Sequence, residues 1–247
     1  MYRHRLGCGP CPGSQAAIPA SSGRPPRREW EKVMQGAGNF YCKDVTKVHR
    51  NLITKRTTTE TGEVLCMKPN MARLRLEKKA DPNDSIAYIC TGREVYEYDG
   101  NAKIVTEYRL AKREVDGNPI FNFLTRAFAA ENRVFDPLSG AFKADGVADR
   151  FEIKLSRQDR NYVYLELVPR LPRDKGQFQS ITLVLYQPAH RKQAYLPARI
   201  RIIGANGDHQ DDWLFREPVM NSKNVTPAAF EFVEPPPGWK TLRPGKP

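Results

Sequence analysis

The feature that most constrains this chain is the alternation of residue types on either side of Lys68-Pro69-Asn70. Before this tripeptide, in residues 62–67, Val64 and Cys66 alternate with Leu65 and Met67. After it, in 71–79, Leu74 and Leu76 alternate with arginines. Period-two alternation is typical of strands with one apolar and one solvated face, and proline interrupts a hydrogen-bond ladder. The stretch therefore predicts a hairpin-like corner in an antiparallel sheet.

The same pattern recurs to the C-terminus and predicts a meander of about ten strands. Residues 40–61, rich in Val, Thr and Ile, predict one long strand. Turn residues such as Asp99-Gly100-Asn101 and 204–208 separate the shorter strands. These shorter strands are expected at 85–91, 94–98, 103–110, 151–155, 162–168, 181–186, 198–203, 212–215 and 230–233.

Two segments show helical spacing instead. In 28–38, Trp30, Val33, Met34 and Ala37 follow the i, i+3, i+4, i+7 pattern of one apolar stripe. Segment 119–130 begins with proline and carries Phe121, Leu124 and Phe128 on one side. The order of helix, strands, helix and strands predicts an α+β fold with helices on one face of an antiparallel sheet.

Length and charge limit the domain organisation. The chain has 247 residues, enough for one large all-β or α+β domain, and a net charge of +12. Residues 1–28 are rich in Pro and Gly, hold five arginines and no acidic residue, and predict a disordered basic tail. We expect one domain over 29–243, followed by a short tail, 244–247. No apolar run is long enough to span a membrane, and the N-terminus has no apolar signal core.

Five cysteines argue against a disulfide framework, because at least one must be unpaired. Cys42, Cys66 and Cys90 lie in predicted strands, where cysteine is usually a small buried hydrophobe. Cys8 and Cys11 form a CGPC sequence, which is the dithiol motif of thioredoxins. The flanking Gly and Pro favour a tail over the strand and helix that a catalytic dithiol needs.

Several short motifs occur in a fixed order along the chain: 30–33 with Phe40, then 68–70, 91–98, 162–170 and 230–239. With this order and spacing, roughly residues 29–243 resemble the LolA-type periplasmic lipoprotein carriers, and in particular the LolA-like paralogues of planctomycetes. The resemblance implies an unclosed, strongly curved antiparallel β-barrel with helices covering its concave face. It also implies a periplasmic or secreted monomer that binds acyl chains without a cofactor and exchanges cargo with membrane-bound lipoprotein-handling proteins.

The resemblance also suggests site residues. An acyl chain in water is penalised by about 0.8 kcal/mol per CH₂, so shielding one chain is worth on the order of 10 kcal/mol. The family has an arginine before the Pro-Asn pair that holds the lid; here that position is Lys68. The family's aromatic cavity residue corresponds to Ala72. The predicted lipid-binding residues are Trp30, Val33, Met67, Leu74, Phe121, Leu124 and Phe128, with Lys68 as the lid latch.

Three alternatives remain open. The aromatic stripe at 121–128 is also what a closed core would contain. Envelope-stress regulators of the MucB/RseB type resemble the same fold and contact a membrane-bound anti-sigma factor. A basic module that binds nucleic acid through Arg73, Arg75, Arg199 and Arg201 is a further possibility, although such alternation is equally typical of a solvated basic face.

Nothing in the sequence predicts an enzyme. The motifs HExxH, GxSxG, GxxxxGK[ST] and GxGxxG are all missing from the sequence. The acidic stretch 208–212 coincides with an expected hairpin turn, where Asp, Asn and Gly are favoured for backbone reasons. We therefore expect neither a metal nor a catalytic residue.

Overall fold

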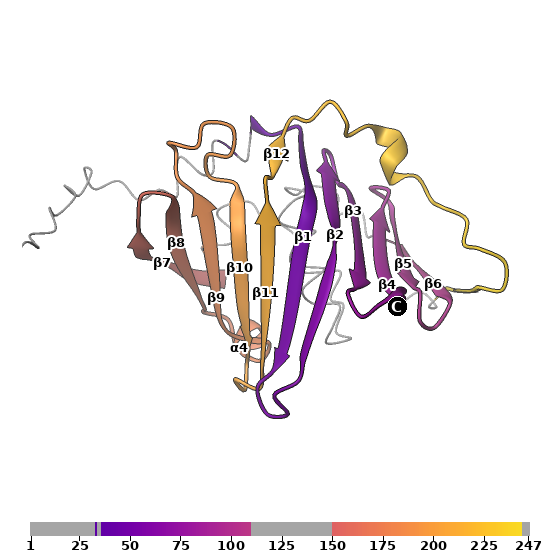
Figure 1. Cartoon of the computed structure of the whole chain (residues 1–247), viewed down its shortest axis with the longest axis horizontal. Coiled ribbons are helices and arrows are strands. Elements are labelled where there is room, and N and C mark those ends of the chain that lie inside the picture. Colours follow the sequence, from indigo (N-terminus) through magenta and orange to yellow (C-terminus); the bar gives the residue numbers. More distant parts are fainter. Residues whose placement is uncertain (1–32, 34–35, 110–149, 244–247) are drawn as a thin grey trace, which may run out of the picture.

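The computed structural model describes residues 33, 36–109 and 150–243, and one sheet dominates this part of the chain (Figure 1). Its thirteen strands follow the order β13-β6-β5-β4-β3-β2-β1-β11-β10-β9-β8-β7, and β12 pairs with β1 beside this path. The strands are β1 Asn39–Asn51, β2 Thr57–Met67, β3 Met71–Lys78, β4 Asp81–Cys90, β5 Glu94–Asp99, β6 Ile104–Arg109, β7 Phe151–Gln158, β8 Tyr162–Pro169, β9 Phe178–Tyr186, β10 Pro197–Gly204, β11 His209–Arg216, β12 Val219–Met220 and β13 Lys240–Leu242.

The sheet consists of two antiparallel meanders, β1 to β6 and β7 to β11, which meet where β1 pairs with β11. In Figure 1 the two meanders form one open curved sheet, and its two end strands, β7 and β13, do not pair with each other. The expectation of an unclosed antiparallel sheet is therefore confirmed. The exception is β13, which adds to the edge of β6 in parallel.

Most expected strands are present, including the corner at Lys68-Pro69-Asn70 between β2 and β3. The single long strand expected over 40–61 is wrong, because the chain turns between β1 and β2. The Asn51 side-chain oxygen accepts hydrogen bonds from the backbone N–H groups of Ile53 and Thr54, and Lys55 has a φ of 56°. This local side-chain hydrogen bonding ends the strand.

The strand expected over 230–233 is also wrong. Pro227–Phe230 forms a 3-10 helix, η3, and the following residues continue without regular structure until β13. Proline has no backbone N–H. The proline at the start of η3 and the three consecutive prolines at 235–237 therefore cannot donate hydrogen bonds to a neighbouring strand. The segment instead runs along the sheet, where Val233 exchanges two hydrogen bonds with the Tyr98 hydroxyl.

Strict alternation gives the sheet two different faces. One of them, the inner face, carries one continuous apolar cluster that spans both meanders. Its largest side chains are Phe40, Leu74, Leu76, Leu185, Trp213 and Phe215, each almost completely buried. The opposite, outer face is mainly polar, with a second small cluster in which Leu65 contacts Val225 and Phe230 of the C-terminal segment.

The bend of the first meander has a local cause. Gly62 on β2 pairs with Val45 on one side and Leu76 on the other. A Cβ at Gly62 would lie 1.8 Å from the carbonyl oxygen of Arg75, so only glycine permits this approach. Beside it, β1 has a bulge between Cys42 and Val45, and bulges increase local twist.

Helices contribute little to the described part of the chain. Its one α-helix, α4 Pro172–Lys175, has four residues and contacts β8 and β9, where Arg150 forms a buried ion pair with Asp174. Among these residues no helix covers the inner face. Apart from Val33 and Gly36, which have helical conformation, the expected helix at 28–38 is largely outside the described residues, and the one at 119–130 is entirely outside them.

Candidate functional site

The inner face changes character along its cross-strand rows. The register of the sheet places one such row across eight strands, from β7 to β3. Its first five residues are apolar and its last three are charged. In order, the row is Leu155, Leu165, Leu183, Ile200, Trp213, Lys47, Glu60 and Lys78.

Two of the charged residues of this row, Lys47 and Glu60, are unusually buried. The Lys47 Nζ lies 3.3 Å from Glu60, and the two side chains are 6% and 17% exposed. The same ammonium group is 5.3 Å from the ring centre of Trp213, a distance suited to a cation–π contact. Buried charges need partners of this kind because desolvation is costly. The row therefore places the Lys47–Glu60 ion pair directly beside a run of apolar side chains.

A second polar pair lies one row further toward the β1–β2 turn. His49 Nδ1 and Asp211 are 2.7 Å apart, and the His49 and His209 rings are 5.9 Å apart. His209 in turn contacts Asp208 at 2.6 Å. The inner face thus has an apolar region and a polar end, which is the arrangement expected of a surface that holds an amphiphilic molecule.

The structure separates the predicted lipid-binding residues that it describes. Leu74 lies in the inner-face cluster, with 1% of its surface exposed. Met67 packs with Leu65 and Phe230 on the outer face. It directly follows the inward-facing Cys66, and successive side chains of a strand point to opposite faces. Val33 is half-buried. Trp30, Phe121, Leu124 and Phe128 lie outside the described residues.

Lys68, the predicted latch, is exposed at the corner between β2 and β3. Its backbone N–H donates a hydrogen bond of 3.0 Å to the carbonyl of Gly38, which precedes β1. The corner is thereby held against the start of the sheet. A contact between Lys68 and the segment 119–130 falls outside the described residues and stays a prediction.

The three strand cysteines are buried, as expected. Burial raises the pKa of the Cys42 thiol to about 12, against weaker opposing hydrogen bonds from the sulfur to Asp44 and Arg216 carbonyls. Burial likewise raises the pKa of the Cys66 thiol. Because the thiolate is the reactive form, these cysteines are poor nucleophiles at neutral pH.

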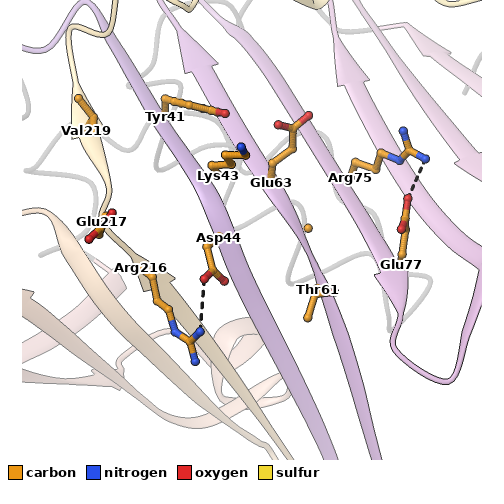
Figure 2. Close-up of a pocket in the computed structure, with 11 residues that line it drawn as sticks. Tyr41, Lys43, Asp44, Thr61, Glu63, Arg75, Glu77, Arg216, Glu217 and Val219 are labelled. Atoms are coloured by element: carbon orange, nitrogen blue, oxygen red, sulfur yellow. Dashed lines mark hydrogen bonds and ion pairs between the residues drawn. The ribbon is translucent and has the colours of Figure 1, made fainter.

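A hollow of about 860 Å³ opens on the outer face at the bulge of β1 (Figure 2). Its lining is polar, and its charges largely compensate one another. Arg216 contacts Asp44 at 3.3 Å and Arg75 contacts Glu77 at 2.7 Å, with Lys43 and Glu63 beside them. Because the charged side chains that line this open hollow pair with one another, they do not converge on a ligand.

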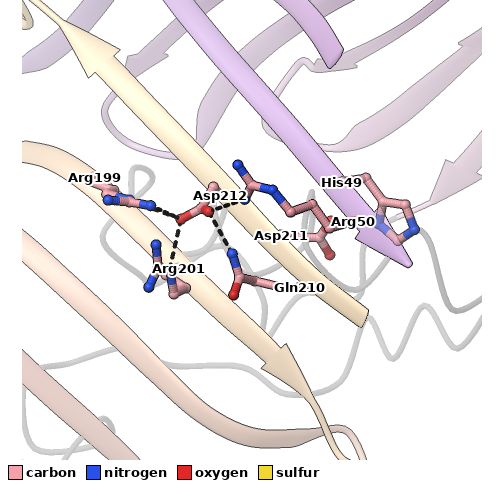
Figure 3. Close-up of polar contacts among 7 residues, drawn as sticks. All are labelled: His49, Arg50, Arg199, Arg201, Gln210, Asp211 and Asp212. Carbon is pink, nitrogen blue, oxygen red and sulfur yellow. Dashed lines mark hydrogen bonds and ion pairs between the residues drawn. The ribbon is translucent and has the colours of Figure 1, made fainter. Parts of the chain in front are cut away.

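The other outer-face feature is a buried carboxylate surrounded by arginines (Figure 3). Asp212 on β11 accepts hydrogen bonds from Arg199 and Arg201 on β10 and from Arg50 on β1, at 2.5 to 3.0 Å. Gln210 adds a further bond of 2.7 Å. Burial by itself raises the pKa of the Asp212 carboxyl, but the three arginines outweigh burial and hold that pKa below its ordinary value.

Sequence reasoning missed this cluster, although part of its signal is visible. Arg199 and Arg201 alternate around Ile200, so they share one face of a strand, as the hypothesis of a basic track assumed. Of the acidic stretch 208–212, only Asp208 lies in the expected turn, because residues 209–212 already belong to β11. The pairing of Asp212 with Arg201 and Val48 depends on strand register, which the sequence does not specify.

No group of three or more metal-ligating side chains occurs among residues 36–109 and 150–243. In the same part of the chain no helix is long and apolar enough to cross a membrane. The described residues therefore define the class of the molecule by its architecture: an open antiparallel sheet with one apolar face.

Comparison with known proteins gives matches at the level of structure alone. No family model matches the chain, and no curated protein matches it. An uncharacterized conserved protein from Thermus thermophilus is 11% identical, with 88% of this chain and 97% of that chain covered and a TM-score of 0.49.

Two further solved structures carry more specific names. A LolA superfamily protein from Nitrosomonas europaea is 11% identical, with 83% and 95% of the two chains covered and a TM-score of 0.40. The MucA/MucB complex of Pseudomonas aeruginosa matches at 13% identity, with 84% and 61% covered and a TM-score of 0.44. The resemblance to LolA-type proteins noted in the sequence thus recurs among the structural matches.

Proposed function

We propose that this protein binds the acyl chain of a lipid or lipoprotein on the inner face of its sheet and acts as a non-enzymatic carrier of the bacterial envelope. The observation that carries the proposal is the single apolar cluster that runs across both meanders of a sheet that does not close. An apolar face of this extent, ending in a fixed ionic group, suits a ligand with a long apolar chain and a polar head.

The chemistry of the described residues supports binding over catalysis. The Cys42 and Cys66 thiols are held in their unreactive form, and the inner-face carboxylates of Glu60 and Asp211 are each paired with a basic group. Export to the periplasm or the cell exterior, a monomeric state and a single domain over 29–243 belong to the same proposal. So do the helices expected to cover the inner face, and contact with membrane-bound lipoprotein-handling proteins.

We place the proposed ligand site on the inner face. This choice keeps most of the residues that the sequence suggested, but not all of them. Leu74 stays in the proposed site, and so do Trp30, Val33, Phe121, Leu124 and Phe128 as predicted lining. Met67 does not, because it packs against the C-terminal segment on the other face. Lys68 remains the proposed latch.

A matched pair of variants tests the site. Leu155 lies on the inner face of β7 and is 50% exposed, whereas Val219 on β12 is 44% exposed and lines the hollow on the outer face. Both positions tolerate a charge without burying it. We expect Leu155→Glu to weaken binding of a fluorescent fatty acid by about tenfold, because a carboxylate would meet the acyl chain. Val219→Glu should bind as the wild type does.

The readouts are displacement of the fluorescent fatty acid and native mass spectrometry of the purified full chain with lipid extraction. Co-purified fatty acid or lipopeptide that is lost in Leu155→Glu supports the carrier. A clean unliganded mass, together with no saturable uptake of the fatty acid by the folded wild type, would refute acyl binding. The remaining role would then be protein contact, as the MucB type of regulator suggests.

A further inference from the structure

The arginine cluster on the outer face carries more positive charge than its carboxylate neutralises. Three guanidinium groups, from Arg50, Arg199 and Arg201, surround Asp212, so the cluster has a formal charge of +2. The Asp212 side chain is 2% exposed, while the three arginine side chains are 36% to 40% exposed. The carboxylate thus lies beneath a surface layer of guanidinium groups.

The geometry leaves several donors of these groups available. Arg201 uses only Nε in its bond to Asp212, and Arg50 uses only one terminal nitrogen. Arg199 uses Nε and one terminal nitrogen, both on the same carboxylate oxygen. Among the described residues, both terminal nitrogens of Arg201 and at least one nitrogen of each of the other two therefore have no acceptor. Guanidinium donors of this kind match the oxygens of phosphate well.

Neighbouring side chains do not cancel the excess charge. The cross-strand row through Asp212 runs from Val48 through Arg201 to Thr182, and the next acidic side chain on it is Glu166, two strands beyond Arg201. Asp211, next to Asp212 in the sequence, points to the inner face and pairs with His49. Asp208 pairs with His209.

The arginines are also held in place before any ligand arrives. Each is anchored to Asp212 from a sheet strand, and Figure 3 shows their side chains converging on that carboxylate from two sides. Fixing long side chains in advance removes much of the ordering cost that weakens surface ion pairs. One bidentate arginine would satisfy a single carboxylate, so neutralising Asp212 does not by itself account for three.

From these observations we infer that Arg50, Arg199 and Arg201 form an anion-binding site for a terminal phosphate group, on the face of the sheet opposite the acyl-binding face. A phosphate monoester or free phosphate carries about −1.5 to −2 charges at pH 7, which matches the formal charge of the cluster. The inference is independent of what the inner face binds. Asp212 acts as a positioning residue that holds the three donors apart and aimed outward.

Calorimetric titration of the full chain with inorganic phosphate, against sodium chloride at equal ionic strength, tests this site. The wild type should bind one phosphate saturably. Arg201→Gln should weaken that binding by about tenfold, because it removes the largest number of available donors. Arg216→Gln is the matched control: Arg216 lies at the end of the same strand as Asp212, contacts Asp44 and is 69% exposed. It should leave phosphate binding unchanged.

A second variant separates a binding role from a purely structural one. Asp212→Asn removes the neutralising charge, so it should lower thermal stability, while added phosphate should raise the melting temperature of this variant more than that of the wild type. If Arg201→Gln does not fold, as judged by circular dichroism, Arg50→Gln takes its place with the same expected loss. Equal weakening in Arg201→Gln and Arg216→Gln, or no saturable phosphate binding by the wild type, would overturn the inference.

The source of the phosphate is distinguished by vesicles. Sedimentation with phosphatidylcholine vesicles that contain phosphatidic acid, reversed by free phosphate and lost in Arg201→Gln, would identify a lipid headgroup. Saturable binding of free phosphate without sedimentation would identify a soluble phosphate ligand.

Discussion

At the scale of single residues, the buried Lys47–Glu60 pair is the most consequential contact of the inner face. Breaking a buried pair leaves an uncompensated charge, at a cost of roughly 3–5 kcal/mol. We expect Lys47→Met to lower the free energy of unfolding by an amount near this range, measured by denaturant titration. The double variant Lys47→Met, Glu60→Leu should recover most of the loss, because neither charge is then buried.

An exposed pair provides the control for that prediction. Asp44 and Arg216 are 51% and 69% exposed and 3.3 Å apart. Such surface pairs contribute between zero and about 1 kcal/mol. If Lys47→Met and Arg216→Met lower the free energy of unfolding by similar amounts, the buried pair stabilises the fold no more than the exposed pair does.

The second residue-scale prediction concerns acid stability. The three arginines hold the pKa of Asp212 below its ordinary value of 3.8, although burial opposes them. A group whose pKa is lowered by folding stabilises the native state above the unfolded-state pKa, and this contribution is lost as the pH falls through the folded-state pKa. The stability difference between the wild type and Asp212→Asn should therefore be constant above about pH 5 and shrink below pH 4.

Unfolding curves collected from pH 7 down to pH 3 check this behaviour. Asp44→Asn, at an exposed carboxylate with a single arginine partner, is a suitable comparison. A difference for Asp212→Asn that stays the same down to pH 3 would show that its carboxylate does not gain from the arginines.

At the scale of elements, the bend between β2 and β3 depends on one missing side chain. We expect Gly62→Ala to destabilise the fold by about 3 kcal/mol or more, because the new Cβ would overlap the Arg75 carbonyl and force the two strands apart. Thermal unfolding measures the effect. Gly36→Ala is the control, since a Cβ there meets nothing within 4 Å. Equal melting temperatures for the two variants would contradict this account of the bend.

The C-terminal segment is a second element with a local anchor. The Tyr98 hydroxyl donates to the Val233 carbonyl at 2.6 Å and accepts from the Val233 N–H at 3.2 Å, and Phe232 lies 4.7 Å from Tyr96 between ring centres. Tyr98→Phe should cost about 1 kcal/mol and speed amide exchange in β13 before it affects β1. Uniform exchange throughout the sheet would show that the segment is not anchored at this point.

Alternation explains how much of these elements the sequence could predict. The strands from β3 to β11 were predictable because one buried face forces a period of two, and Pro69 marks a corner on local grounds. The turn after Asn51 was missed because Thr and Lys fit both a strand and a turn. The end of the chain was misread because Phe230 and Phe232 alternate like a strand while their backbone has other partners.

At the scale of the whole molecule, the two meanders meet along one seam, the pairing of β1 with β11. Eight register pairs join these strands, and Val45 lies opposite Phe215 within the apolar cluster. We expect the two halves to stay associated after cleavage at a protease site introduced between residues 110 and 149. Size-exclusion chromatography should show both fragments in one peak.

Weakening the seam provides the control. Phe215→Asp places a charge in the apolar cluster beside Val45, and the cleaved variant, which keeps the β12–β1 and β13–β6 pairings, should dissociate at a lower denaturant concentration than the cleaved wild type. Separation of the cleaved wild type would mean that chain connectivity, not strand pairing, holds the meanders together.

The candidate sites were less predictable than the fold, and the whole-molecule register explains why. Which side of the sheet a residue faces follows from local alternation, but which residues become neighbours across the seam does not. Arg50 and Asp212 are 162 residues apart, and their contact exists only because β1 and β11 pair in one register. The buried position of Lys47 over Trp213 depends on the same pairing.

This seam also has a consequence for synthesis of the chain. Asn51 at the end of β1 pairs with His209 at the start of β11, so β1 leaves the ribosome long before its partner exists. At roughly 5–20 residues per second, that interval lasts on the order of ten seconds. Throughout it, one edge of the nascent first meander is open to unrelated strands. Escort of the nascent chain during this interval would therefore protect that open edge from pairing with other strands.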